Sequence, residues 1–139
     1  MAYWVKIDYE RKAYFIDLDR ISVFICAPNG RLTFWLPASS IPIILNRQSN
    51  LEAYYKIHDY IKQLTSQSLG RTWVKLFYDR KEYIIDLDRI GSFCYANKKL
   101  TFWLPESSTP IVLSEQIEPE AYEKVKDFLT QKTGKPIDS

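Results

Sequence analysis

The segment Ile16-Asp-Leu-Asp-Arg-Ile21 recurs as Ile85-Asp-Leu-Asp-Arg-Ile90, and Leu32-Thr-Phe-Trp-Leu-Pro37 recurs as Leu100-Thr-Phe-Trp-Leu-Pro105. The offset is 69 positions in the first block and 68 in the second, because the second copy lacks one residue between them. Identities are 15 of 24 in the first block and 20 of 37 in the second, which makes 35 of 61. Chance does not produce this agreement, so the sequence predicts a tandem duplication.

The chain of 139 residues then divides into copy one, residues 1–68, and copy two, residues 69–139. The polar linker over 66–72 is too short to let the copies move far apart. The tail after Gly134 is expected to fray. A copy of this size is marginally stable alone, so we expect the copies to bury surface against each other.

Alternation of apolar and polar residues predicts five strands in each copy. Short polar connections at 10–12 and 79–81, and the Pro28-Asn-Gly30 segment, predict tight hairpins. A final segment in each copy predicts one amphipathic helix, because its apolar residues fall at steps of three and four. In copy one these residues are Leu51, Tyr54, Ile57, Ile61 and Leu64.

These elements predict an α+β fold in which each copy is a five-stranded antiparallel meander followed by one C-terminal helix. We expect the two copies to pack about a pseudo-two-fold axis. The order of the elements around Asp-Leu-Asp-Arg-Ile and Leu-Thr-Phe-Trp-Leu-Pro resembles small bacterial meander-plus-helix modules, some of which are similar to pleckstrin-homology-like domains. The resemblance is architectural: it implies small barrels as one form of the fold and carries over no site residue.

One helix covers only one face of a sheet, so the other face needs its own cover. Burying a large apolar side chain is worth roughly 1.5–3 kcal/mol, and eight of them on an open face would promote aggregation. The other copy, closure into a barrel, or a partner molecule could cover this face. Its residues are Trp4, Phe15, Phe24 and Trp35 in copy one and Trp73, Ile84, Phe93 and Trp103 in copy two.

The duplicated polar cluster consists of Asp17, Asp19 and Arg20, with Asp86, Asp88 and Arg89 in copy two. If the strand continues through this segment, both carboxylates of a copy share one face, about 7 Å apart. They could accept hydrogen bonds from turn amides and pair with the arginines, or with Lys6 and Lys75. Two alternatives stay open, a Mg²⁺ or Ca²⁺ site that lacks further oxygen ligands and an acid–base pair.

No catalytic constellation is otherwise present. His58 is the single histidine, and Cys26 and Cys94 do not occupy matching positions. Without a second histidine, catalytic triads and histidine-based metal sites have too few residues. We therefore expect neither an enzyme nor a bound cofactor or metal.

Composition points to a globular protein in a reducing, cytoplasmic setting and not in a membrane: hydrophobic residues are 46%, net charge is +2 and there are two cysteines. The aromatic content of 15% favours a protein-binding adaptor or regulator, either a monomer with an internal pseudo-dimer or a homo-oligomer. The edge of the fifth strand could accept a peptide. The alternative is single-stranded nucleic acid binding, with aromatic platforms beside basic groups. The candidate surface is Trp4, Lys6, Trp35, Trp73, Lys75, Trp103, Arg11, Lys12, Arg80 and Lys81.

Overall fold

The computed structural model describes residues 2–66, 72–107 and 109–137. All strand pairs are antiparallel and two helices are present in this part of the chain, so the α+β class is confirmed. The predicted linker, and with it the boundary between residues 68 and 69, lies largely outside the described residues. The first half contains β1 (Trp4–Tyr9), β2 (Lys12–Asp17), the 3₁₀ turn η1 (Leu18–Arg20), β3 (Val23–Cys26), β4 (Arg31–Trp35), β5 (Pro42–Asn46) and α1 (Leu51–Ser66).

The second half has the same order of elements. It contains β6 (Trp73–Tyr78), β7 (Lys81–Asp86), η2 (Leu87–Arg89), β8 (Phe93–Ala96), β9 (Lys99–Trp103), β10 (Pro110–Ser114) and α2 (Pro119–Thr133).

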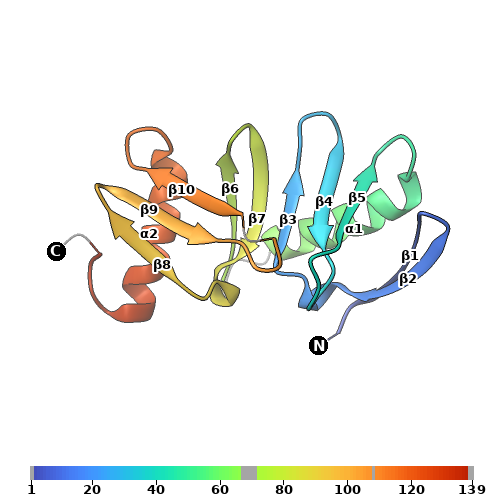
Figure 1. Cartoon of the computed structure of the whole chain (residues 1–139), viewed down its shortest axis with the longest axis horizontal. Helices are drawn as coiled ribbons and strands as arrows, with labels where there is room; N and C mark the ends of the chain where they lie inside the picture. The colour runs from blue at the N-terminus through green and yellow to red at the C-terminus, as the bar shows by residue number, and fades with distance from the viewer. Residues whose placement is uncertain (1, 67–71, 108, 138–139) are drawn as a thin grey trace.

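The strands form three sheets, and the middle one combines both halves. Its order is β5-β4-β3-β7-β6, while β1-β2 and β10-β9-β8 form separate sheets. In Figure 1 the β1–β2 hairpin lies at the right end of the long axis and the β8–β10 sheet at the left end. The predicted five-stranded meander within each half is therefore wrong. The 3₁₀ turn after β2 separates β2 from β3, so β3 pairs with β7 of the other half.

The predicted pseudo-two-fold packing is also wrong. A two-fold axis would repeat each contact with the halves exchanged, so β3 against β7 would be matched by β8 against β2. In the described residues β3 pairs with β7, but β2 pairs only with β1 and β8 only with β9. The halves therefore meet head to tail. All three sheets of the described chain are open, with two end strands each, so no closed barrel is seen.

The predicted tight hairpins are present, and their turn residues have positive φ angles. Glu10 and Arg11 have φ of 50° and 65°, and Asp79 and Arg80 have φ of 51° and 65°. Two such residues in succession give a turn whose twist matches that of the flanking strands. The β3–β4 hairpin uses Gly30 at φ 83°.

Two hydrophobic cores lie beneath the helices, and each includes a residue from the other half. The first core contains Ile84 together with Phe24 and Ile57, while the second contains Val23 together with Leu76 and Val125. Because each half places a residue in the core of the other, the junction belongs to both cores. At the C-terminal end Ile137 packs partly buried against the second core.

Candidate interaction surfaces

The junction between the halves is a continuous strand pair with a buried apolar face. Phe24 lies opposite Ile84, and both are fully buried. Trp73 stacks on Phe24, with ring centroids 6.1 Å apart. The Asp86 amide donates to the Ser22 carbonyl oxygen at 3.0 Å, which extends the pairing beyond β3. Phe24 and Ile84 also pack in the first core with Ile57 and other residues of α1. The prediction that they lie on the face away from the helix is therefore wrong, and α1 together with Trp73 covers this part of the sheet.

Strands β2 and β8 correspond to the two strands of this junction, but in the described residues each has a neighbouring strand on one edge only. In the aligned halves, β2 matches β7 and β8 matches β3. Within the described ranges β2 pairs only with β1, and β8 pairs only with β9. Each therefore has an outer edge whose backbone N–H and C=O groups lack a strand partner. The two strands lie toward opposite ends of the molecule (Figure 1).

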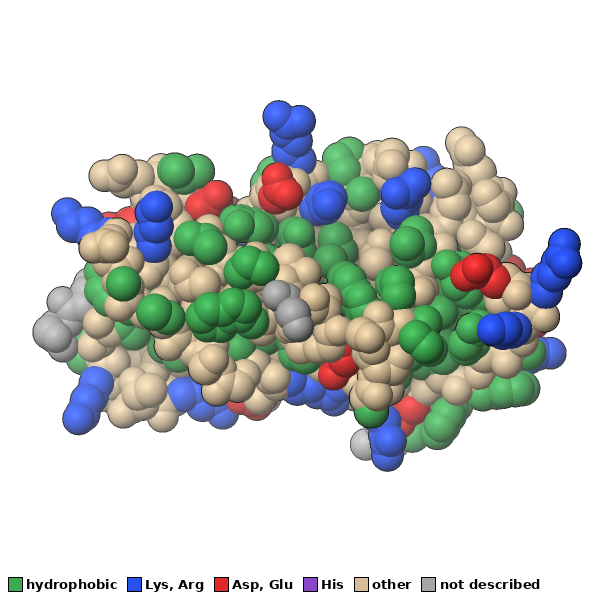
Figure 2. Space-filling view, viewed as in Figure 1, with side chains coloured by type: hydrophobic (Ala, Val, Ile, Leu, Met, Phe, Trp, Pro, Cys, Tyr) green, Lys and Arg blue, Asp and Glu red, His purple; other side chains and the backbone are tan. Residues whose placement is uncertain are grey.

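The aromatic side chains near these edges are exposed. Phe15 on β2 is 68% exposed and Trp4 beside it is 66% exposed, while Trp103 on β9 is 45% exposed. Hydrophobic side chains are visible at both ends of the face in Figure 2. Trp35 and Trp73 instead pack partly buried against the second and first cores. The other half therefore helps to cover Trp35 and Trp73 but leaves Trp4 and Trp103 exposed.

The edge of the fifth strand differs from these two edges. The Ile44 amide of β5 donates to the Tyr9 hydroxyl at 3.3 Å, and the Val112 amide of β10 donates to the Tyr78 hydroxyl at 3.3 Å. Each edge also begins with a proline, which has no N–H to donate. These edges are partly occupied by the chain itself and offer a poorer template for a peptide than β2 and β8.

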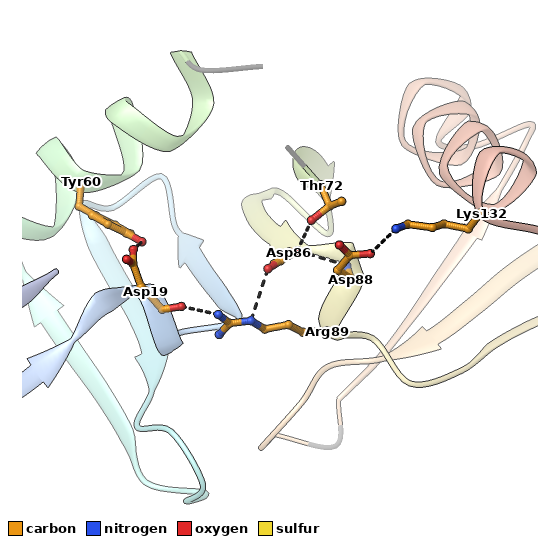
Figure 3. A network of polar contacts seen from close by, with 7 residues as sticks. All are labelled: Asp19, Tyr60, Thr72, Asp86, Asp88, Arg89 and Lys132. Atoms are coloured by element: carbon orange, nitrogen blue, oxygen red, sulfur yellow. Dashed lines mark hydrogen bonds and ion pairs between the residues drawn. The ribbon is translucent and has the colours of Figure 1, made fainter. Parts of the chain in front are cut away.

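A polar network spans the junction through Arg89 (Figure 3). The guanidinium donates to the backbone oxygen of Asp19 in the other half, and its Nε lies 3.4 Å from Asp86 Oδ2. Asp86 Oδ1 also accepts from the Thr72 hydroxyl and, at 3.2 Å, from the Asp88 amide. The carboxylate of Asp86 is thus occupied by protein groups and fixes the start of η2.

The second aspartate of each pair turns toward the helix of its own half (Figure 3). Asp19 Oδ1 accepts from the Tyr60 hydroxyl at 2.5 Å, and Asp88 Oδ1 lies 3.1 Å from Lys132 Nζ. Burial raises the pKa of Tyr60, and the bond to Asp19 raises it further. Tyr60 therefore stays protonated and acts as a donor at neutral pH.

In the first half, Asp17 makes the matching local contacts but Arg20 does not cross a junction. Asp17 Oδ1 accepts from the amides of Tyr3 at 2.9 Å and Asp19 at 3.1 Å. Arg20 Nε lies 3.9 Å from Asp17 Oδ2, and the Arg20 side chain is 75% exposed. The prediction that Asp17 and Asp19 share a strand face is wrong, because β2 ends at Asp17 and η1 follows. No group of three or more metal-ligating side chains occurs in the described chain.

The remaining basic residues of the predicted surface do not form one groove. Arg11, Lys12, Arg80 and Lys81 lie at or beside two separate hairpin turns. Lys75 Nζ lies 3.6 Å from Glu82 and so faces a carboxylate. On the face drawn in Figure 2, Lys and Arg side chains lie around the rim rather than over the centre.

The two cysteines differ in environment. Cys26 is partly buried on β3, and burial, with a smaller contribution from Glu82, raises its thiol pKa to about 11. Its thiolate fraction at neutral pH is correspondingly small, which makes it a poor nucleophile. Cys94 is exposed on β8.

The sequence analysis did not predict that the outer edges of β2 and β8, with Phe15 and Tyr95 on them, form the candidate interaction surface. The residues were visible, but only the topology shows which copy of each matched pair lacks a neighbour. No protein-family model, curated protein or solved structure matches this chain. In the described residues, neither helix is long and apolar enough to cross a membrane.

Proposed function

We propose that this chain is a non-catalytic protein-interaction module, built by tandem duplication, that binds a partner through the outer edges of β2 and β8. The observation that carries the proposal is Phe15: it is 68% exposed on a strand with an unpaired edge, while its counterpart Ile84 is fully buried in the junction. At equivalent positions, Ile84 is a core residue because β3 lies beside its strand, whereas Phe15 is exposed because its strand has no neighbour on that edge.

Strand addition is the binding mode that this arrangement supports. Main-chain hydrogen bonds from an incoming strand supply affinity, and pockets for alternate side chains supply specificity. Large aromatic side chains are the usual anchors of such interfaces. Covering Trp4 and Phe15 would be worth roughly 1.5–3 kcal/mol each before the costs of association are subtracted.

The other functions have weaker support. The carboxylates of Asp17 and Asp86 are held by backbone amides, a hydroxyl and arginines, which argues against an acid–base pair. Single-stranded nucleic acid is the second proposal, carried by exposed Trp4 beside Lys6. Trp35 and Trp73 pack against cores, so they are poorly placed to stack bases. A reducing compartment such as the cytoplasm remains our proposal for the location.

Site-specific photo-crosslinking in the native cell tests the proposal. A photoreactive amino acid replaces Phe15, and a control replaces Phe77, which is 66% exposed on the outer strand β6 of the middle sheet. We expect a protein adduct at position 15 that is absent at position 77. No protein adduct at 15, or an adduct with nucleic acid instead, would contradict the proposal.

A further inference from the structure

The internal junction shows how a β3-type strand pairs with a β2-type strand. It joins β3 to β7 in the register Phe24 with Ile84, Ile25 with Tyr83 and Cys26 with Glu82. The inner partners keep the same registers in both halves: β1–β2 matches β6–β7, and β8–β9 matches β3–β4. The outer edge of β2 is therefore the edge that β7 uses in the junction, and the outer edge of β8 is the edge that β3 uses.

We propose that β8 of one copy pairs antiparallel with β2 of a second copy, so that the chain assembles head to tail. This inference rests on the proposed function and names its partner as a second copy of the chain. Transfer of the junction register places Phe93 opposite Phe15 and Tyr95 opposite Ala13 of the neighbour.

The exposed apolar residues agree with this partner at matched positions on both edges. Trp4 corresponds to Trp73, which stacks on Phe24, and would stack on Phe93 of the neighbour. Trp103 corresponds to Trp35, which packs against the core of the other half. Binding of an unrelated peptide strand would account for one open edge. It would not account for the correspondence of both open edges to the two edges that pair in the junction.

The polar groups also match. Arg89 crosses the internal junction to the backbone oxygen of Asp19. Its counterpart Arg20 has a 75% exposed side chain with its nearest carboxylate oxygen 3.9 Å away. In the assembly Arg20 would reach the backbone oxygen of Asp88 of the neighbour, which is the position that corresponds to Asp19.

The contact joins two different surfaces at opposite ends of the molecule (Figure 1). Such a heterologous contact does not close a dimer, and it extends into a chain or a ring of copies. Ile137 packs against the second core, and within the described residues 134–137 the chain does not add a strand to β8.

The first test measures the size of the purified full-length protein by sedimentation velocity over about a hundredfold range of concentration. We expect the average mass to rise beyond that of a dimer. Phe15→Lys should weaken association by about tenfold or more, because a charge would be buried without a partner. Phe77→Lys is the matched control and should associate like the parent protein. A monomer at all concentrations, or equal loss in both variants, would overturn the inference.

The second test checks the register by disulfide trapping. Cys26 and Cys94 are replaced by serine, and cysteines are placed at the exposed positions Ala13 and Tyr95. Directly opposed strand residues have the Cα separation that a disulfide needs, so oxidation should produce a ladder of covalent multimers. The control pairs Ala13→Cys with Val112→Cys on β10 and should give no ladder. Equal ladders, or none from Ala13→Cys with Tyr95→Cys, would contradict the register.

The two proposals fail separately. If the purified protein stays monomeric while position 15 captures a different protein in cells, the head-to-tail inference is wrong and the proposed function stands. If position 15 captures the chain itself, both stand. If the protein stays monomeric and captures nothing, both are wrong.

Discussion

Replacing Ile84 by alanine is the most direct test of the junction between the halves. Ile84 is fully buried and lies opposite Phe24 in the β3–β7 pair. Truncating a buried isoleucine removes its transfer free energy and leaves a cavity, which together cost about 2–5 kcal/mol. Ile84→Val removes one methylene and should cost about 0.5–1.5 kcal/mol. The two variants should therefore form a graded series.

The matched control is Phe15→Ala, at the position that corresponds to Ile84. Phe15 is 68% exposed, so its truncation should change the free energy of unfolding by less than about 0.5 kcal/mol. The comparison is informative because the two hairpins have the same register and similar sequences. The two sites differ in the side chain and in the presence of β3 and the first core around Ile84.

Urea unfolding of the full chain, followed by far-UV circular dichroism, gives these free energies. The protein concentration should be low enough that association does not contribute to the free energy of unfolding. The slopes of the transitions should agree, so that the midpoints report stability alone. Equal losses for Ile84→Ala and Phe15→Ala, or a loss below about 1 kcal/mol for Ile84→Ala, would refute the head-to-tail junction.

Three further outcomes follow from the polar network and the thiols. Tyr60→Phe should lower the free energy of unfolding by about 1.5–3 kcal/mol in urea titrations, because it removes a partly buried hydrogen bond to a carboxylate. Arg89→Met should destabilise the protein in the same assay, whereas Arg20→Met should be nearly neutral in the monomer. At pH 8 iodoacetamide should modify Cys94 much faster than Cys26, as read by peptide mass spectrometry, because burial raises the pKa of Cys26 to about 11 and leaves little thiolate below that pH. Comparable rates would contradict the burial of Cys26.

The local elements could be predicted from the sequence because each is fixed by a local pattern. The alternation of apolar residues gives the strands, short polar segments between them give the tight turns, and steps of three and four give the helices. Pro119 begins α2 and Gly134, at φ 73°, ends it, as is usual for these residues.

The strand partners could not be predicted, and the reason lies in the similarity of the two halves of the sequence. The core-facing residues of β2 and β7 are the same, Tyr14 and Ile16 against Tyr83 and Ile85. To β3 both strands present almost the same surface, so the sequence pattern does not state which one it joins. The 3₁₀ turn that follows β2 determines the pairing, because it directs the chain away from the β1–β2 hairpin. The edge of β3 is then free to pair with β7.

The polar candidate site was mispredicted for a related reason. Asp-Leu-Asp reads as a continuation of the alternating strand, which would place both carboxylates on one face. Asp17 instead caps η1 by accepting from the Asp19 amide, which turns Asp19 toward α1. Aspartate favours such caps over strand interiors, so the cap overrides the alternation.

The head-to-tail junction also accounts in physical terms for the presence of two similar halves in one chain. In a repeat protein the stability is approximately the sum of the stabilities of its units and of the contacts between neighbours. One unit of this kind would leave both the β2-type edge and the β3-type edge bare. Each added unit contributes one more junction, while one β2-type edge and one β3-type edge stay bare at the two ends. Joining units within one chain and the proposed end-to-end assembly of chains therefore cover the same kind of exposed strand edge. In the single chain Phe15 and Tyr95 lie on the two edges that stay exposed.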